Sequence, residues 1–257
     1  RFPPQTFKLK TGDQVVETGS MNPAGTIFDI GEERGLVRIK MGPKVMPLEG
    51  RCSVGPSGPV DSRVIRGALY RFADRLLESP TVPNAALDLL RRAPPRIKGR
   101  ESGEPIVKGS GSQEKAYLEA VSGLDNSYLF IQGPPGSGKT YTSGHLIVSL
   151  IAQGHKIGIT SNSHKAIHNL LDMVVGVAEQ KGVVFQGIKK CSTGNPETIY
   201  RHRFIENTDK TEKINLSAEL FAGTAWLFSH PHFAKQLDYL FIDEAGQVAT
   251  AARFPKG

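Results

Sequence analysis

One segment of the chain combines glycines, a lysine and a hydroxyl side chain at a spacing that suits phosphate. It fits the pattern G-x-x-x-x-G-K-[ST] and consists of Gly133, Pro134, Pro135, Gly136, Ser137, Gly138, Lys139 and Thr140. The glycines let backbone N–H groups surround phosphate oxygens, and a following helix adds its positive dipole end. Lys139 would reach the β- and γ-phosphates, and the Thr140 hydroxyl would bind Mg²⁺. Chance gives such a match in about one chain in a hundred of this length, so we expect a nucleoside triphosphate site that extends to Tyr141.

A pair of acidic residues forms the second candidate site. Asp243 and Glu244 directly follow the apolar residues 240–242. A Walker-B aspartate occupies such a position, at the carboxyl end of a strand, where α/β sheets bind their ligands. Asp243 would hold Mg²⁺, and Glu244 would orient and deprotonate an attacking water. A solvent-exposed acidic strand end is the alternative, and the phosphate loop makes it the weaker interpretation.

Three further segments accompany these two in a recognisable order. Gln113 precedes the phosphate loop by about twenty residues, SNSHKAI occupies 161–167, and GTAW occupies 223–226. With the phosphate loop and DEAGQ at 243–247, this order resembles superfamily 1 helicases. The most similar branch is the 5′-to-3′ group, superfamily 1B, which includes the nonsense-mediated-decay helicase. Within it, GTAWLFS and DYLFIDEAGQV resemble bacterial proteins that fuse a RecB-like nuclease to such a helicase. The resemblance covers about 112–250.

The resemblance implies ATP and Mg²⁺ as cofactors of a motor on single-stranded nucleic acid. Gln113 matches the glutamine that recognises the adenine edge, and an amide can donate and accept hydrogen bonds at once. The alternative is a glutamine that merely begins an exposed helix. In such a motor, Lys139 and Mg²⁺ would neutralise charge on the γ-phosphate while Glu244 activates water.

The same resemblance implies contacts with a nucleic-acid strand. The residues concerned are Asn162, Ser163, His164, Lys165, Thr224 and Ala225. N–H groups at a helix start, hydroxyls and a lysine all suit a sugar–phosphate backbone, although Asn162 or Ser163 could simply cap the helix. His164 and His168 stand at i and i+4, but Lys165 replaces the glutamate of H-E-x-x-H, so we interpret both as non-metal residues. Trp226 is expected in the core rather than as a base-stacking platform.

The elements that must position these residues follow from hydrophobic patterning. From residue 112 on, apolar strands alternate with helices, which predicts a parallel sheet covered on both faces. Strands are expected at 128–132, 156–160, 220–224 and 239–243, and helices at 113–121, 139–153 and 164–180. The fold class is therefore α/β, and the resemblance specifies a RecA-like P-loop NTPase domain.

The first part of the chain has a different pattern. Residues 1–60 contain short strands with Gly/Pro turns, including a hairpin candidate at 26–40, and suggest a small β-barrel. Helices are expected over 61–78 and 85–92, before the Pro-, Gly- and Ser-rich residues 93–111. We therefore predict a barrel (1–60), a helical stalk (61–92), a linker (93–111) and a first RecA-like domain (112–257), an order that the resemblance also implies.

Composition and charge restrict the partners. The 257-residue chain is 39% hydrophobic and 22% charged, which is typical of a globular protein, and without an apolar run of about 20 residues we expect no membrane partner. Its net charge is +7, and residues 1–110 hold 18 basic and 12 acidic side chains. The sharpest basic cluster consists of Arg91, Arg92, Arg96, Lys98 and Arg100. It favours a polyanion, most commonly nucleic acid, as partner, with a solvated face or a basic linker as the alternative, and the resemblance implies single-stranded DNA or RNA.

Cysteine content and chain limits add two expectations. Cys52 and Cys191 are too few for a disulfide framework, so we expect a reducing compartment and a cytoplasmic protein. The chain begins at Arg1 without Met, so we expect a piece of a longer protein that has a second RecA-like domain and a nuclease domain elsewhere. An arginine finger is worth about 10³–10⁵ in rate, so this piece should bind nucleotide and hydrolyse it poorly. Two alternative functions stay open. The chain could be another phosphate-loop enzyme, such as a small-molecule kinase, or a non-catalytic nucleic-acid-binding module.

Overall fold

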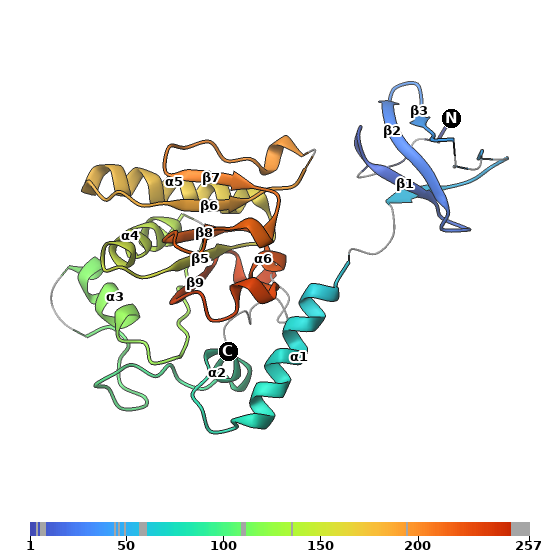
Figure 1. The fold of residues 1–257 in the computed structure, drawn as a ribbon. Coiled ribbons are helices and arrows are strands. Elements are labelled where there is room, and N and C mark those ends of the chain that lie inside the picture. The colour runs from blue at the N-terminus through green and yellow to red at the C-terminus, as the bar shows by residue number, and fades with distance from the viewer. Residues whose placement is uncertain are drawn as a thin grey trace. The chain divides into compact units, whose positions relative to one another are not determined.

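The computed structural model describes all residues except 4, 6–8, 44, 46, 49, 57–60, 109–111, 135, 194 and 248–257. The chain divides into two compact units, Arg1–Asp61 and Ser62–Gly257, whose elements are labelled in Figure 1. The finer division into barrel, stalk, linker and motor domain stays a prediction.

The first unit contains a four-stranded antiparallel sheet in the order β3-β2-β1-β4. Its strands are β1 (Gln14–Glu17), β2 (Pro23–Gly31), β3 (Leu36–Lys40) and β4 (Val54–Pro56). Strands β2 and β3 form the hairpin predicted at 26–40, with Gly31 opposite Leu36 at its turn. Val15, Ala24 and Ile27 are buried in a small core of this unit.

Three helices precede the predicted phosphate loop and lie where the sequence predicts helices. They are α1 (Arg63–Glu78), α2 (Ala85–Arg91) and α3 (Gln113–Ser122). Helix α2 begins at Asn84, whose side chain accepts hydrogen bonds from two backbone N–H groups of the first turn. Within the second unit, α1 contacts the end of α6. The guanidinium of Arg71 donates to the Ser229 carbonyl at 2.7 Å.

The second unit contains a five-stranded parallel sheet in the order β7-β6-β8-β5-β9. Its strands are β5 (Ile157–Thr160), β6 (Gly187–Lys190), β7 (Ile205–Thr208), β8 (Leu220–Ala222) and β9 (Tyr239–Ile242). The helices that accompany it are α4 (Lys139–Ala152), α5 (His164–Lys181) and α6 (Ala225–Ser229), with short 3₁₀ turns η1 (Pro196–Thr198), η2 (Thr211–Lys213), η3 (Pro231–Phe233) and η4 (Ala245–Gln247).

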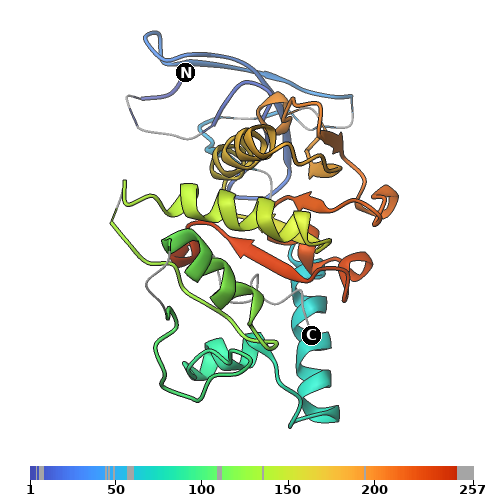
Figure 2. The same ribbon diagram turned by 90° about the vertical axis from the view of Figure 1, so that its left-hand side faces the viewer.

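Successive side chains of a strand point to opposite faces of a sheet. Here they enter two different cores, so both faces of this sheet are covered. Ile157 and Ile159 of β5 belong to the cluster that contains the buried side chains of α4 and α5. Phe221 of β8 belongs to a second cluster with Leu227 and Phe228 of α6. Figures 1 and 2 show α4 and α5 on one side of the strands and α6 on the other. The predicted α/β fold class is confirmed, and the arrangement is consistent with a RecA-like P-loop domain.

The strand predicted at 128–132 is wrong. Residues 127–134 have no ladder partner within the described part of the chain, and Phe130 and Ile131 are 63% and 45% exposed. An apolar run raises strand propensity, but a strand also needs a neighbour to pair with. Conversely, β6 (GIKK) and β7 (IENT) escape detection because half or more of their residues are polar.

Candidate functional site

The predicted site residues follow strands of the parallel sheet at their carboxyl ends. Ser161 follows β5, Gly223 comes directly after β8, and Asp243 comes directly after β9. These strands are neighbours in the sheet, and backbone hydrogen bonds continue past their ends, from Gly223 N–H to Ile159 O (3.1 Å) and from Asp243 N–H to Thr160 O (2.9 Å). The loops after them therefore lie at one edge, where α/β sheets bind ligands.

The predicted phosphate loop leads into α4, which begins at Lys139. Only residues 153–156 join the C-terminus of α4 to β5, so the N-terminus of α4 lies toward the carboxyl edge of the sheet. Gly136 and Gly138 both have a φ of +81°, a left-handed backbone that favours glycine. The Lys139 ammonium donates to the carbonyls of Gly133 (2.8 Å) and Pro134 (2.9 Å). This cation therefore lies against the loop that would hold the phosphates.

Short contacts hold the loop together. The Ser137 N–H donates to the Pro134 carbonyl at 3.2 Å. A Cβ at position 133 would lie 2.3 Å from Ser137 Oγ, so a replacement of Gly133 requires the Ser137 side chain to move. Thr140 is half-buried in the first turn of α4, and Pro135 lies outside the described residues.

Asp243 and Glu244 have an unusual backbone. Glu244 has a φ of +51°, a region that residues other than glycine rarely adopt and that is concentrated at functional sites. Its N–H donates to Asp243 Oδ1 at 3.0 Å. Asp243 is half-buried and Glu244 is exposed. The outlier supports a functional interpretation of this acidic pair.

The loop after β5 combines capping with exposed polar groups. Ser163 caps α5, because its Oγ accepts a hydrogen bond from the Ala166 N–H at 3.1 Å. Asn162 and Lys165 are exposed beside this cap. Capping by Ser163 leaves both of these side chains on the surface, so the capping interpretation and the strand-binding interpretation are compatible.

His164 meets a buried cation that the sequence did not single out. The Lys189 ammonium lies 2.8 Å from His164 Nδ1. Burial, followed by the charge of Lys189, lowers the pKa of His164 from 6.5 to about 4, and burial also lowers the pKa of His168. Both rings are therefore neutral at pH 7. Among the described residues, no group of three or more His, Cys, Asp and Glu side chains could hold a metal ion.

Gln113 lies at the start of α3, beside a polar cluster that links three helices. Gln113 is exposed, and the next residue, Glu114, accepts from His145 Nδ1 (3.0 Å) and Lys181 Nζ (2.7 Å). These hydrogen bonds, that from Lys181 first, hold the pKa of Glu114 below its usual value. The Tyr141 ring lies 4.3 Å from the His145 ring and is exposed. Gln113 and Tyr141 are thus carried by helices that this cluster fixes together.

The loop after β8 only partly matches expectation. Thr224 is the N-cap residue of α6 but makes no side-chain capping bond. Ala225 is buried against Ile242, so its side chain is not on the surface. Trp226 is 42% exposed, so the expectation that it lies in the core is wrong. Its position on the short helix α6 turns it outward, while Leu227 and Phe228 fill the core instead.

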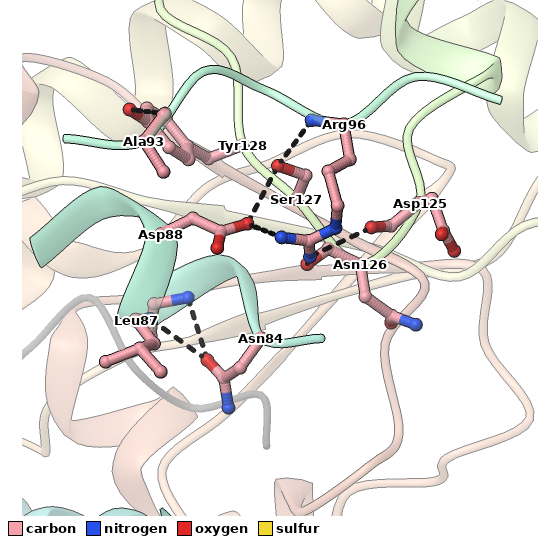
Figure 3. Close-up of polar contacts among 10 residues, drawn as sticks. Asn84, Leu87, Asp88, Ala93, Arg96, Asp125, Asn126, Ser127 and Tyr128 are labelled. Carbon is pink, nitrogen blue, oxygen red and sulfur yellow. Dashed lines mark hydrogen bonds and ion pairs between the residues drawn. The ribbon is translucent and has the colours of Figure 1, made fainter. Parts of the chain in front are cut away.

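The basic cluster of the sequence divides into two kinds of residue. Arg96 forms an ion pair with Asp88 and donates to the carbonyls of Asp125 (3.2 Å) and Asn126 (2.8 Å). Figure 3 shows that these contacts join α2 to the segment before the predicted phosphate loop. Arg91 and Arg92, in contrast, are exposed. The guanidinium of Arg96 therefore stabilises the contact between α2 and residues 125–126, whereas the exposed side chains of Arg91 and Arg92 are accessible to a binding partner.

Comparisons with known proteins find one family model and several named relatives. The model of the AAA domain family matches residues 110–221. The "DNA replication ATP-dependent helicase/nuclease DNA2" of Gallus gallus is 28% identical over 235 residues, which are 88% of this chain and 22% of that protein. The proteins of the same name from Mus musculus and Homo sapiens are 32% and 28% identical over 151 and 152 residues, each match covering 56% of this chain and 14% of the relative. These matches support a superfamily 1 helicase-like family.

The region matched by the family model contains several of the candidate residues. The chain spans about a fifth or less of the length of these relatives. The matched family region contains Gln113, the predicted phosphate loop and the loop after β5, and it ends at β8. In the described residues, no helix is long and apolar enough to cross a membrane.

Two residues at the carboxyl edge, Thr160 and Lys189, were missed by the sequence analysis, whereas Ser161 belongs to the segment 161–167 that it named. Thr160 Oγ1 and Ser161 Oγ are buried and have no hydrogen-bond partner among the described residues. Thr160 ends an apolar strand next to Ser161, and a hydroxyl residue at that position is a signal that could have found it. Lys189 is the third residue of the four-residue strand β6, which has no recognisable pattern, so only the structure reveals it.

Proposed function

We propose that this chain is the ATP-binding part of a helicase motor that couples ATP hydrolysis to movement along single-stranded DNA or RNA. One observation carries the proposal. Lys139 and Thr140 begin α4 at the same sheet edge at which Asp243 and Glu244 follow β9. A nucleotide held by the first pair would have its γ-phosphate directed toward the second pair, as the in-line attack of water requires.

Each residue has a defined task in this proposal. The Lys139 ammonium exchanges its two loop carbonyls for phosphate oxygens, and charge-assisted hydrogen bonds are the stronger kind. Glu244 accepts a proton from the attacking water. The Thr140 hydroxyl and the Asp243 carboxylate are hard oxygen donors of the kind that Mg²⁺ prefers. When bound, Mg²⁺ would supply neutralisation of phosphate charge. Gln113 and Tyr141 would contact the base.

The nucleic-acid strand is proposed to cross the loops after β5 and β8. Asn162, Ser163, His164 and Lys165 offer amide, hydroxyl, imidazole and ammonium groups, and Thr224 adds a hydroxyl from the neighbouring loop. Such groups bind the sugar–phosphate backbone without reading sequence. Because Ala225 is buried, only its backbone could take part.

The complete motor requires more than this chain. The relatives are named helicase/nuclease proteins, and this chain spans 14–22% of the three described above. We propose that the full protein adds a second RecA-like domain, which supplies an arginine finger, and a RecB-like nuclease. The free thiols of Cys52 and Cys191 fit a reducing compartment and support a cytoplasmic location.

ATP turnover tests the proposal. Phosphate release is measured for this chain and for a longer chain that includes the second domain, each with and without single-stranded DNA or RNA. We expect slow turnover by this chain and faster, strand-stimulated turnover by the longer one. Turnover that no strand alters, with ATP still bound, would favour a small-molecule kinase or a non-catalytic binding module.

A further inference from the structure

Lys189 is one of the largest fully buried side chains of the described residues, with an exposed fraction of 0%. Its ammonium has three hydrogen-bond partners. They are His164 Nδ1 (2.8 Å), the Lys190 carbonyl (2.8 Å) and the Thr198 carbonyl (3.3 Å). An ammonium has three protons to donate, so these partners satisfy it completely. None of the three is a carboxylate, so the buried charge is held by neutral acceptors.

Packing alone does not explain a lysine at this position. Removing an ammonium from water costs several kcal/mol even after the protein relaxes, and an apolar side chain of similar length would fill the same volume without that cost. What the lysine adds is a link between elements. His164 is the first residue of α5, Lys190 ends β6, and Thr198 ends η1. One cation therefore fixes the start of α5 against the carboxyl end of β6.

The contact with His164 also sets the chemistry of that ring. An ammonium can only donate, so Nδ1 of His164 must be the acceptor. The ring is then neutral and carries its proton on Nε2. The low pKa of His164, about 4, agrees with this state, and its causes are burial and the charges of Lys189, His168 and Lys190. His164 thus offers a neutral N–H donor over a wide range of pH.

We propose that Lys189 is a positioning residue for the strand-binding loop at 161–165, which it serves by holding His164 as the tautomer that donates from Nε2 to the backbone of a single strand. The inference rests on the proposed strand-binding function of that loop. Lys189 itself cannot touch the strand, because it is fully buried. Its effect must pass through His164 and through the position of the loop.

The test compares Lys189→Met with Lys190→Met. Methionine has nearly the length of lysine, is apolar and suits a buried site. Lys190 is the matched control, because its substitution changes the net charge equally while its ammonium contacts the carbonyls of Cys191 and Asp209 instead of His164. Three quantities are measured on the full chain: the ¹⁵N spectrum of the histidine rings, the affinity for a single-stranded oligonucleotide and the affinity for ATP.

We expect Lys189→Met to shift the ring nitrogens of His164 away from a single Nε2–H tautomer. We also expect it to weaken oligonucleotide binding at least about tenfold and to change ATP binding less than about twofold. Lys190→Met should leave the His164 spectrum unchanged and weaken oligonucleotide binding less. If Lys189→Met leaves the His164 spectrum unchanged, or shifts it without loss of strand affinity, the positioning role is refuted.

The proposed function fails in a different way. If the wild type binds no single strand, the proposed function is contradicted. If the His164 spectrum nevertheless differs between the wild type and Lys189→Met, the link between Lys189 and His164 is still supported. A measurement on the wild type covers the case in which the variant does not fold. Burial and the charge of Lys190 lower the pKa of Lys189 from 10.5 to about 8, against the opposing effect of Cys191. At pH 6 to 7, where Lys189 is protonated, the ring nitrogens of wild-type His164 should report a single neutral Nε2–H tautomer, and a charged ring or a mixture of tautomers would overturn the proposal.

Discussion

The ammonium of Lys139 lies against its own loop, bonded to two neutral carbonyls at 2.8 and 2.9 Å. Phosphate oxygens are charged, so exchanging these carbonyls for phosphate strengthens both hydrogen bonds. We expect Lys139→Ala to lower ATP affinity at least about 100-fold. Titration calorimetry measures this affinity. Lys98→Ala is the control, because Lys98 is an exposed lysine of the segment before α3. Equal affinities of the two variants would exclude Lys139 from the nucleotide site.

Glu244 is expected to affect turnover and not binding. Its side chain is exposed, and its backbone has a left-handed φ of +51° two residues after the end of β9. A glutamine keeps the shape of this side chain and cannot take a proton from water. We predict that Glu244→Gln binds ATP like the wild type and loses about 10²–10⁴-fold in turnover, as single-turnover phosphate release would measure. Unchanged turnover would assign the base to another residue.

The titration of Lys189 predicts a dependence of stability on pH. Burial lowers its pKa in the folded chain to about 8, against 10.5 when unfolded. Between these values the unfolded chain binds more protons than the folded chain, so the free energy of unfolding rises with pH. The contribution is at most about 3 kcal/mol. Urea unfolding at pH 7.5, 8.5 and 9.5 should show this rise in the wild type and in Lys190→Met but not in Lys189→Met. Parallel profiles for all three chains would show that Lys189 does not titrate in this window.

At the scale of elements, the sequence is most informative where a motif and a periodic pattern coincide. Helix α4 is predicted at 139–153 and found at Lys139–Ala152, because a glycine-rich loop marks its start and apolar residues mark its buried face. The strand predicted at 128–132 is wrong because apolar residues do not reveal whether a neighbour is available to pair. Lys189 illustrates a further limit. Its burial follows from the positions of α5 and η1, which no local pattern contains.

The basic cluster provides an element-scale prediction, because its arginines differ in their contacts. Arg96 joins α2 to residues 125–127 and forms an ion pair with Asp88. We expect Arg96→Ala to cost about 1–3 kcal/mol of stability, because the part-buried carboxylate of Asp88 loses its cationic partner and keeps, among the described residues, only the Ser127 hydroxyl at 3.1 Å. The exposed Arg91 and Arg92 should instead contribute to the salt dependence of strand binding.

The substitutions that separate these roles are Arg96→Ala on one side and Arg91→Ala with Arg92→Asn on the other. Asparagine is chosen because Arg92 has a φ of +54°, which asparagine tolerates. We expect only the Arg91/Arg92 variant to flatten the plot of log affinity against log salt, and only the Arg96 variant to lower the melting temperature. A flattened slope for Arg96→Ala without loss of stability would restore it as a phosphate contact.

For the whole molecule, the two compact units differ in charge. Residues 1–61 hold 8 basic and 7 acidic side chains, whereas residues 62–110 hold 10 basic and 5 acidic ones. The positive charge of the first half of the sequence therefore belongs to the second unit, which also contains the predicted nucleotide site. A polyanion should therefore be attracted mainly to the second unit, which carries the excess positive charge, and not to the antiparallel sheet of the first unit.

Removal of residues 1–61 tests this division. The second unit has its own sheet and two cores, so we expect the shortened chain to fold and to bind ATP like the full chain. Because the excess charge remains, the salt slope of single-strand binding should change by less than about one unit. Affinities measured between low and moderate salt give this slope for both chains. A slope that falls by several units, with ATP binding retained, would show that the antiparallel unit supplies the phosphate contacts, and the strand path would then have to include β1–β4.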